Sequence, residues 1–324
     1  MPAVDVTYLI PAFRAQATIE AALRSAVAQE GVRVEAIVVD DASDDDTAAV
    51  VARLAAREPR IRLVRLPENR GPSAARNAAI AEASGRFLGV LDADDTLAPG
   101  RTRALLDLAT MTGAEIAADD LVRLDASGAA AGRALPAGAT PYAFMLDPAS
   151  YCADNVPMAG RFGTGYLKPI IASAFVAERQ LAYDPSVRLG EDFLFCLEAM
   201  LAGARYVVSS TPGYLYAARP GSLSHRIAAT RLAELEAGLD RVASRRMAAA
   251  AEPATAQAIA RYRAGLGRAH GFLEAVETAK EGRHGVAAAR LGRDPALWPL
   301  ALRYGGEAAA NRLPGRRRAR GAAQ

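Results

Sequence analysis

Short apolar runs alternate with amphipathic stretches along the first half of the chain. The apolar runs predict strands, and the stretches between them, whose apolar residues recur at helical spacing, predict helices. This alternation favours an α/β fold with a mainly parallel sheet and helices on both faces. The predicted strands are 6–10, 34–39, 61–66, 87–91 and 115–118, and the predicted helices are 18–29, 47–57, 72–83 and 101–111.

The pattern changes twice further along the chain. Residues 125–140 are rich in Ala, Gly and Pro without a sustained period, which predicts a loop over the sheet. An irregular section follows, and a helix is expected from residues 190–192 to about Leu201. From Ala228 onward, leucines recur at helical spacing, which predicts an α-helical appendage. We therefore expect an α/β domain over 1–227, divided near residue 120, and a helical region with a basic tail over 228–324.

Composition narrows the class of protein. With 51% hydrophobic and 23% charged residues, the chain is typical of a globular protein. The net charge of +3 requires no nucleic-acid partner. A basic run over 316–320 indicates a solvated tail, or alternatively a contact with anionic lipid headgroups.

Three further absences bear on location. Two cysteines cannot form a dense disulfide framework, the first residues lack the layout of a secretory signal, and no apolar stretch approaches the ~20 residues of a membrane span. We expect a cytoplasmic protein whose membrane contact, if it has one, is peripheral.

Polar clusters follow the first, second and fourth predicted strands, where an open parallel sheet binds its ligands. The densest is Asp92-Ala93-Asp94-Asp95. Three neighbouring carboxylates repel one another, and hard divalent cations prefer oxygen ligands, so a Mg²⁺ or Mn²⁺ ion that bridges them to a diphosphate satisfies both sides. The alternative is an exposed turn that caps a helix.

Three other residues at this edge have both a binding and a structural interpretation. Asp41 can accept a hydrogen bond from a base or ribose, or cap the helix that begins at Thr47. An acidic pair after a strand also occurs in receiver domains, but this chain is much longer and its pair follows the second strand. Phe13 can stack on a planar base or pack, and Arg76 can reach a phosphate or form a surface salt bridge.

Two later segments carry further candidates. Glu191 and Asp192 precede an apolar run, so they can supply a general base or favour a helix N-terminus. Residues 214–226 mix Gly, Ser, His and Arg, the composition of a flexible loop that closes over an anion. Within it, His225 is a candidate contact for a diphosphate or a metal, although a surface role is the simpler interpretation.

Taken together, these motifs resemble the family 2 glycosyltransferases of GT-A fold, and their order and spacing make the match specific. The resemblance extends to about Arg226, and within the family residues 162–170 and 214–224 look like bacterial exopolysaccharide enzymes of the succinoglycan glucosyltransferase kind. The motifs that carry it are Tyr8-Leu9-Ile10-Pro11-Ala12-Phe13, Val38-Val39-Asp40-Asp41-Ala42-Ser43, Asn69-Arg70-Gly71-Pro72-Ser73-Ala74-Ala75-Arg76-Asn77, Leu91-Asp92-Ala93-Asp94-Asp95 and Gly190-Glu191-Asp192.

The resemblance implies a role for each matching residue. Phe13 stacks on the base, Asp41 bonds the uracil edge, and Asp92 and Asp94 form a D-x-D signature, with Asp92 near the ribose and Asp94 on the metal. Asp192 is the catalytic base, and Glu191 shapes the acceptor site. Arg14 departs from the family, which commonly has Asn there. The expected nucleotide-sugar contacts are Pro11, Phe13, Asp41, Arg76, Asp92, Arg219, Ser222 and Ser224, and the expected metal ligands are Asp94, Asp92 and His225.

The implied reaction is an inverting transfer of a sugar, such as glucose, from a UDP-sugar. The acceptor is a hydroxyl of a saccharide or a lipid-linked oligosaccharide. The resemblance implies that residues 1–120 hold the nucleotide-sugar and residues 121–227 hold the acceptor. Two other functions compete with it. A sugar-nucleotide nucleotidyltransferase is disfavoured because residues 1–14 contain no glycine for a phosphate loop. A non-catalytic scaffold is disfavoured by the intact Asp92, Asp94 and Asp192.

Overall fold

The computed structural model describes residues 4–136, 142–158, 162–217, 228–302 and 304. Within them, ten strands form one sheet in the order β3-β2-β1-β4-β9-β6-β10-β5, with β7 beside β6 and β8 beside β10. The strands are β1 Val6–Ala12, β2 Val34–Asp40, β3 Ile61–Arg65, β4 Phe87–Val90, β5 Thr96–Leu97, β6 Ile116–Leu124, β7 Ala130–Arg133, β8 Ala143–Leu146, β9 Ile170–Ala172 and β10 Tyr206–Ala217.

The first four predicted strands are the parallel part of the sheet. β3, β2, β1 and β4 pair in parallel, and each lies within a residue or two of its predicted bounds. β6 begins one residue after its predicted start, runs past its predicted end to Leu124, and pairs in parallel with β10. β5, β7, β8 and β9 pair antiparallel with their neighbours, and β9 lies between β4 and β6.

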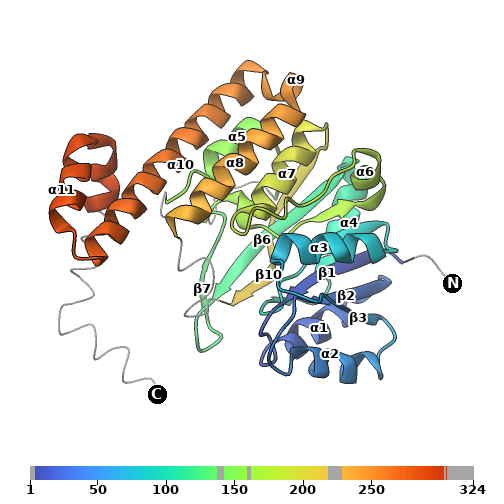
Figure 1. Ribbon diagram of the computed structural model, residues 1–324. Helices are drawn as coiled ribbons and strands as arrows, with labels where there is room; N and C mark the ends of the chain where they lie inside the picture. The colour runs from blue at the N-terminus through green and yellow to red at the C-terminus, as the bar shows by residue number, and fades with distance from the viewer. Residues whose placement is uncertain (1–3, 137–141, 159–161, 218–227, 303, 305–324) are drawn as a thin grey trace.

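Helices cover both faces of this sheet, as predicted. α1 and α2 lie on one face of the β1–β3 region and α3 lies on the other, while α4 packs on β6 and β10 (Figure 1). The predicted α/β class, with helices on both faces of the sheet and further helices at the C-terminal end, is confirmed within the described residues. The helices of this part are α1 Ile19–Val27, α2 Thr47–Ala55, α3 Pro72–Glu82, α4 Arg101–Thr112, α5 Pro148–Asp154, α6 Ser173–Glu178 and α7 Glu191–Leu201, with a 3₁₀ turn η1 at Thr164–Tyr166.

Two loop predictions are wrong for part of their range. Ala130–Arg133 form β7 inside the predicted loop, and all four side chains are exposed, so no alternation of apolar and polar residues marks the strand. The predicted flexible segment at 214–226 begins inside β10, because Tyr214 is wholly buried and pairs with Leu121 of β6. Residues 218–227 lie outside the described residues.

The C-terminal helices share the core of the sheet domain. They are α8 Ala229–Arg245, α9 Met247–Ala250, α10 Pro253–Lys280 and α11 His284–Arg293, followed by a 3₁₀ turn η3 at Pro295–Leu297. Leu232, Leu235 and Leu239 of α8 join the same buried cluster as the sheet strands and α7. The helical character predicted beyond residue 228 is confirmed within the described residues, but the packing crosses that boundary.

Gly238 lies where α8 packs closely against α7 and Val187. A Cβ atom at this position would lie 2.5 Å from Leu194 of α7 and 2.8 Å from Val187. Only a hydrogen atom fits there without displacing buried side chains.

We predict that Gly238→Ala lowers the free energy of unfolding by about 1–3 kcal/mol, because it overpacks the α7–α8 contact. Gly267→Ala in α10 is the matched control, since a Cβ there meets nothing within 4 Å and should stabilise the helix by about 0.5–1 kcal/mol. Urea denaturation of both variants measures the difference. Equal stability of the two variants would show that α8 does not pack closely on α7.

Candidate functional site

The predicted site residues of the described chain gather at the carboxyl edge of the parallel strands. Pro11 is the next-to-last residue of β1, Asp40 ends β2 directly before Asp41, and Asp92 follows β4. Arg76 lies in α3, and Glu191 and Asp192 form the first turn of α7. The sheet topology thus brings together residues more than 100 positions apart in sequence. Arg219, Ser222, Ser224 and His225 lie outside the described residues.

Asp41 shapes the loop in front of α3. Its two carboxylate oxygens accept the backbone N–H groups of Arg70 and Gly71, each at 2.8 Å. Gly71 has φ +86°, a conformation that a residue with a side chain rarely adopts. The helix at Thr47 is served by Asp45 instead, whose Oδ1 accepts the Thr47 N–H at 3.0 Å. The capping alternative for Asp41 is therefore wrong, and its contact with a base stays a prediction.

Phe13 and its neighbours form an open surface after β1. The Phe13 ring is 45% exposed and lies under the Arg14 guanidinium, 5.1 Å from its carbon. Arg14 has φ +51°, and Asn tolerates this left-handed conformation better than most residues, which explains why Asn suits the position. Arg14 pairs with Asp44 at 2.6 Å. The exposed ring remains available for stacking.

A polar hollow of about 410 Å³ adjoins this surface at the ends of β2 and β3. Its rim includes Ser43, whose hydroxyl accepts the Arg14 N–H at 3.0 Å. The hollow therefore adjoins the turn that carries Phe13 and Arg14. The lining residues are Ala42, Ser43, Arg65, Leu66 and Pro67.

Arg76 is at the centre of a buried ion cluster. It is 2% exposed, so the surface salt bridge considered for it is wrong. Its guanidinium donates to Glu191 at 2.9 Å and Asp92 at 2.8 Å, and lies 3.6 Å from Asp192. Arg76 therefore joins the acidic residues after β4 to the acidic pair at the start of α7.

Lys168 is the second cation of this cluster and was not among the predicted site residues. Its Nζ lies 2.6 Å from Asp192 Oδ2 and 2.8 Å from Asp92 Oδ2. Burial alone would lower the pKa of Lys168, but attraction to Asp192 and Asp92 outweighs it and holds this pKa above its ordinary value. Of the 39 lysines and arginines in the chain, two are lysines, Lys168 and Lys280. This rarity of lysine was the sequence signal that could have drawn attention to Lys168.

The acidic residues after β4 have different environments. Burial would raise the pKa of Asp92, but Lys168 and Arg76 outweigh burial and lower it to about 2. Burial and the charges of Asp92 and Asp94 raise the pKa of Asp95 to about 8. Asp95 accepts the Tyr214 hydroxyl and the Ala217 N–H, both at 2.8 Å. Asp92 is thus ionised and Asp95 largely protonated at neutral pH.

These environments bear on the predicted metal site. No group of three or more His, Cys, Asp or Glu side chains within the described residues is arranged to hold an ion. Mg²⁺ commonly takes one or two carboxylates and completes its shell with substrate phosphates and water. The carboxylates after β4 are therefore enough for an ion that takes most of its ligands from a diphosphate and water, and ligation by Asp94, Asp92 and His225 stays a prediction.

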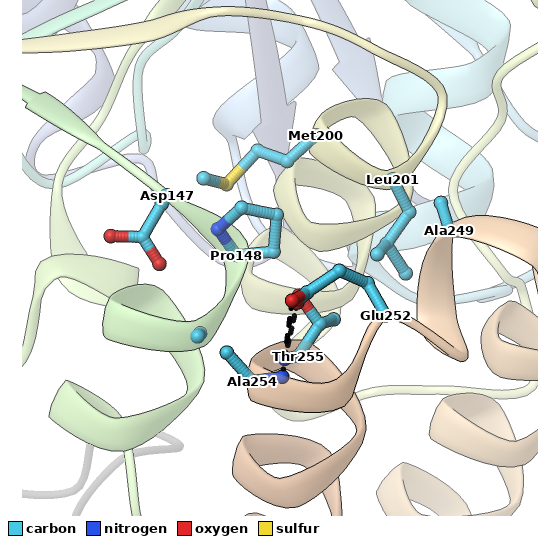
Figure 2. Close-up of a pocket in the computed structure, with 9 residues that line it drawn as sticks. Asp147, Pro148, Met200, Leu201, Ala249, Glu252, Ala254 and Thr255 are labelled. Carbon is cyan, nitrogen blue, oxygen red and sulfur yellow. Dashed lines mark hydrogen bonds between the residues drawn. The ribbon is translucent and has the colours of Figure 1, made fainter.

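A second cavity lies away from this site. It has a volume of about 400 Å³ and lies between α5, the end of α7 and the start of α10 (Figure 2). Its two acidic groups cap helices: Glu252 accepts the Ala254 and Thr255 N–H groups, and Asp147 accepts the Ser150 N–H. Met200 lines it near the end of α7, about 12 Å along the helix from Asp192. The cavity contributes nothing to the acidic site.

Residues 7–171 match the family described as Glycosyl transferase family 2, and the chain belongs to this family. It is 40% identical over 222 residues to the succinoglycan biosynthesis protein ExoO of Rhizobium meliloti, across 68% of this chain and 62% of that protein. It is 38% identical to ExoU of the same organism, across 68% of this chain and 64% of that protein. The chain therefore spans less than two thirds of the length of these relatives.

Solved structures share the fold. S. aureus TarS 1–349 in complex with UDP-GlcNAc matches with a TM-score of 0.61 at 16% identity, across 93% of this chain and 92% of that chain. The mannosyltransferase PcManGT from Pyrobaculum calidifontis, in complex with GDP-Man and Mn²⁺, matches with a TM-score of 0.58 at 20% identity. That match covers 96% of this chain and 82% of the other. The resemblance deduced from the motifs is confirmed.

Proposed function

We propose that this protein is an inverting glycosyltransferase that moves a hexose, such as glucose, from a UDP-sugar to a hydroxyl of a growing lipid-linked exopolysaccharide. Its similarity to two succinoglycan biosynthesis proteins supports a role in exopolysaccharide synthesis. The TarS complexes with UDP and UDP-GlcNAc support a UDP-sugar donor. We propose residues 1–120 for the nucleotide-sugar and residues 121–227 for the acceptor. The α8–α7 packing makes α8 a part of this catalytic unit.

The observation that carries the proposal is the unequal hydrogen bonding of the two Asp192 carboxylate oxygens. Oδ2 accepts the Lys168 ammonium at 2.6 Å, while Oδ1 is buried and has no hydrogen-bond partner among the described residues. A buried carboxylate oxygen without a donor is costly unless a ligand supplies one. A hydroxyl of the acceptor supplies that donor, and a general base needs to lie within hydrogen-bond reach of the proton that it removes.

The chemistry follows as a single displacement. Asp192 Oδ1 takes the acceptor hydroxyl proton while the acceptor oxygen forms its bond to the anomeric carbon. The bond from that carbon to the diphosphate oxygen breaks, and UDP leaves with the electron pair. Attack opposite to the leaving group converts an α-linked donor into a β-linked product. Glu191, held by Arg76 at 2.9 Å, borders the acceptor side of Asp192.

We propose that the donor lies across the carboxyl edge of the sheet. Phe13 stacks on the uracil, Asp41 and Pro11 border it, and Asp92 lies near the ribose. A Mn²⁺ or Mg²⁺ ion at Asp94 would neutralise charge on the departing diphosphate. We also propose nucleotide-sugar contacts from Arg219, Ser222 and Ser224, and a metal or diphosphate contact from His225, which follow β10 in the chain.

We propose peripheral contact with the cytoplasmic face of the inner membrane through the last helical turns. Trp298 and Leu302 are 52% and 77% exposed and lie four residues apart, which places them on one helix face. They lie beyond α11, which is remote from the sheet in Figure 1. Residues 281–324 contain nine arginines and three carboxylates, a balance that attracts anionic headgroups. None of the described helices is long and apolar enough to span a bilayer.

Asp192→Asn tests the proposed base. The amide keeps the size of the side chain but does not take up a proton at neutral pH, so turnover should fall by about 10²–10⁴ while donor affinity is retained. UDP release measures turnover, and calorimetry measures UDP-sugar affinity. Asp240→Asn, at an exposed position of α8, is the control and should transfer normally. Near-normal turnover of Asp192→Asn would contradict the assignment, and pyrophosphate release in place of UDP would contradict sugar transfer.

Asp94→Ala tests the proposed metal site. In a thermal-shift screen of UDP-, GDP- and dTDP-sugars with Mn²⁺, the wild-type Tm should rise most with a UDP-sugar, because that ligand binds the native state. Asp94→Ala should lose both this rise and turnover, since the carboxylate that links ion and diphosphate is gone. Asp107→Ala, in an exposed pair on α4, should behave as wild type. Full activity of Asp94→Ala in excess EDTA would rule out the metal site.

A paired Trp298→Ala and Leu302→Ala variant tests the membrane contact. Co-sedimentation with phosphatidylglycerol vesicles should weaken by about tenfold, because the variant loses apolar surface that enters the bilayer interface. Met111→Ala removes another exposed apolar side chain, from α4, and should bind as wild type. If the paired variant binds phosphatidylglycerol vesicles as well as the wild type does, these residues do not contact an anionic membrane surface. The same follows if the wild type binds neutral phosphatidylcholine vesicles as well as phosphatidylglycerol vesicles.

A further inference from the structure

Lys168 is held at a fixed point between the donor residues and the proposed base. It lies between η1 and β9, and the side chain is buried. Its backbone carbonyl accepts a hydrogen bond from Arg101 of α4, which is itself paired with Asp119 of β6 at 2.7 Å. The ammonium group therefore projects from a backbone that the buried Arg101–Asp119 pair holds in place.

The two carboxylates that Lys168 joins depend on it unequally. Asp92 has a second partner, because its Oδ1 accepts a hydrogen bond from Arg76 at 2.8 Å. Asp192 has no second hydrogen bond among the described side chains, since Arg76 Nη2 lies 3.6 Å from its Oδ2. Removing the ammonium group would leave Asp92 hydrogen-bonded to Arg76, whereas Asp192 would keep only the longer 3.6 Å ion pair with Arg76, which orients its carboxylate less firmly.

We propose that Lys168 is a positioning residue for sugar transfer, which holds Asp192 Oδ2 so that Oδ1 faces the acceptor hydroxyl. The inference rests on the proposed role of Asp192 as the base. An ammonium group is a compact charge with three donors, so it can bridge two carboxylates that approach from different directions, whereas guanidinium donors lie in one plane. The same ammonium reaches Asp92, so the position of the base is tied to the residue proposed to lie near the donor ribose.

Lys168→Met removes the charge and donors but keeps most of the side-chain length. We expect kcat to fall by about 10², the loss typical of a catalytic group displaced by about 1 Å. The donor Kd should change far less, because Asp92 keeps Arg76. Lys280→Met, at the exposed end of α10, is the matched control and should transfer normally. If Lys168→Met does not fold, Lys168→Arg keeps the charge, and its kcat should still fall while donor binding persists.

A double-mutant cycle separates positioning from a purely structural role. If Lys168 acts through Asp192, adding Lys168→Met or Lys168→Arg to Asp192→Asn costs little further turnover. The proposal would be overturned if the loss of kcat in the double variant equalled the product of the losses in the two single variants. A wild-type kcat in both Lys168 variants would also overturn it. A parallel loss of donor affinity and kcat would also overturn it, because it assigns Lys168 to the donor site alone. If Asp192→Asn itself transfers sugar normally, the proposed base fails instead.

Discussion

The arrangement of the site depends on one buried ion cluster. Arg76 and Lys168 contribute two positive charges to the carboxylates of Asp92, Glu191 and Asp192. Charges removed from water are tolerated only when each has partners, and loss of one partner from a buried pair costs about 3–5 kcal/mol. The cluster therefore constrains the end of β4, the helix α3 and the first turn of α7 to one another.

This constraint explains how Asp92 and Asp95 lie close together without strong mutual repulsion. The two cations compensate Asp92, and Asp95 retains its proton while it binds Tyr214 and Ala217 of β10. Similar side chains within four residues thus have separate tasks, because burial and neighbouring charges shift their pKa values in opposite directions. Asp95 also connects the acidic edge to the strand that leads into residues 218–227, where four of the proposed contacts lie.

The C-terminal helix α8 also helps to position α7, the helix whose first turn carries Glu191 and Asp192. Leu235 of α8 approaches Gly190, the residue before Glu191, and Gly238 lets α8 lie directly on Leu194. Glu198 of α7 binds Arg245 of α8 at 2.6 Å. The helix that carries the proposed base is therefore braced by a region whose sequence contains no motif of the active site. We infer that orientation of α7 is one function of that region.

The sequence alone determined the fold class, the five strands β1, β2, β3, β4 and β6, and the edge at which the acidic motifs meet. These features follow from local periodicity and from the rule that parallel strands place their ends together. It did not reveal β7, whose side chains are all exposed, or the pairing of β10, which depends on β6 about 90 residues earlier. Only the tertiary structure brought Lys168 to Asp92 and Asp192, because an ion pair depends on distance and burial, and neither is encoded in the spacing of residues along the chain.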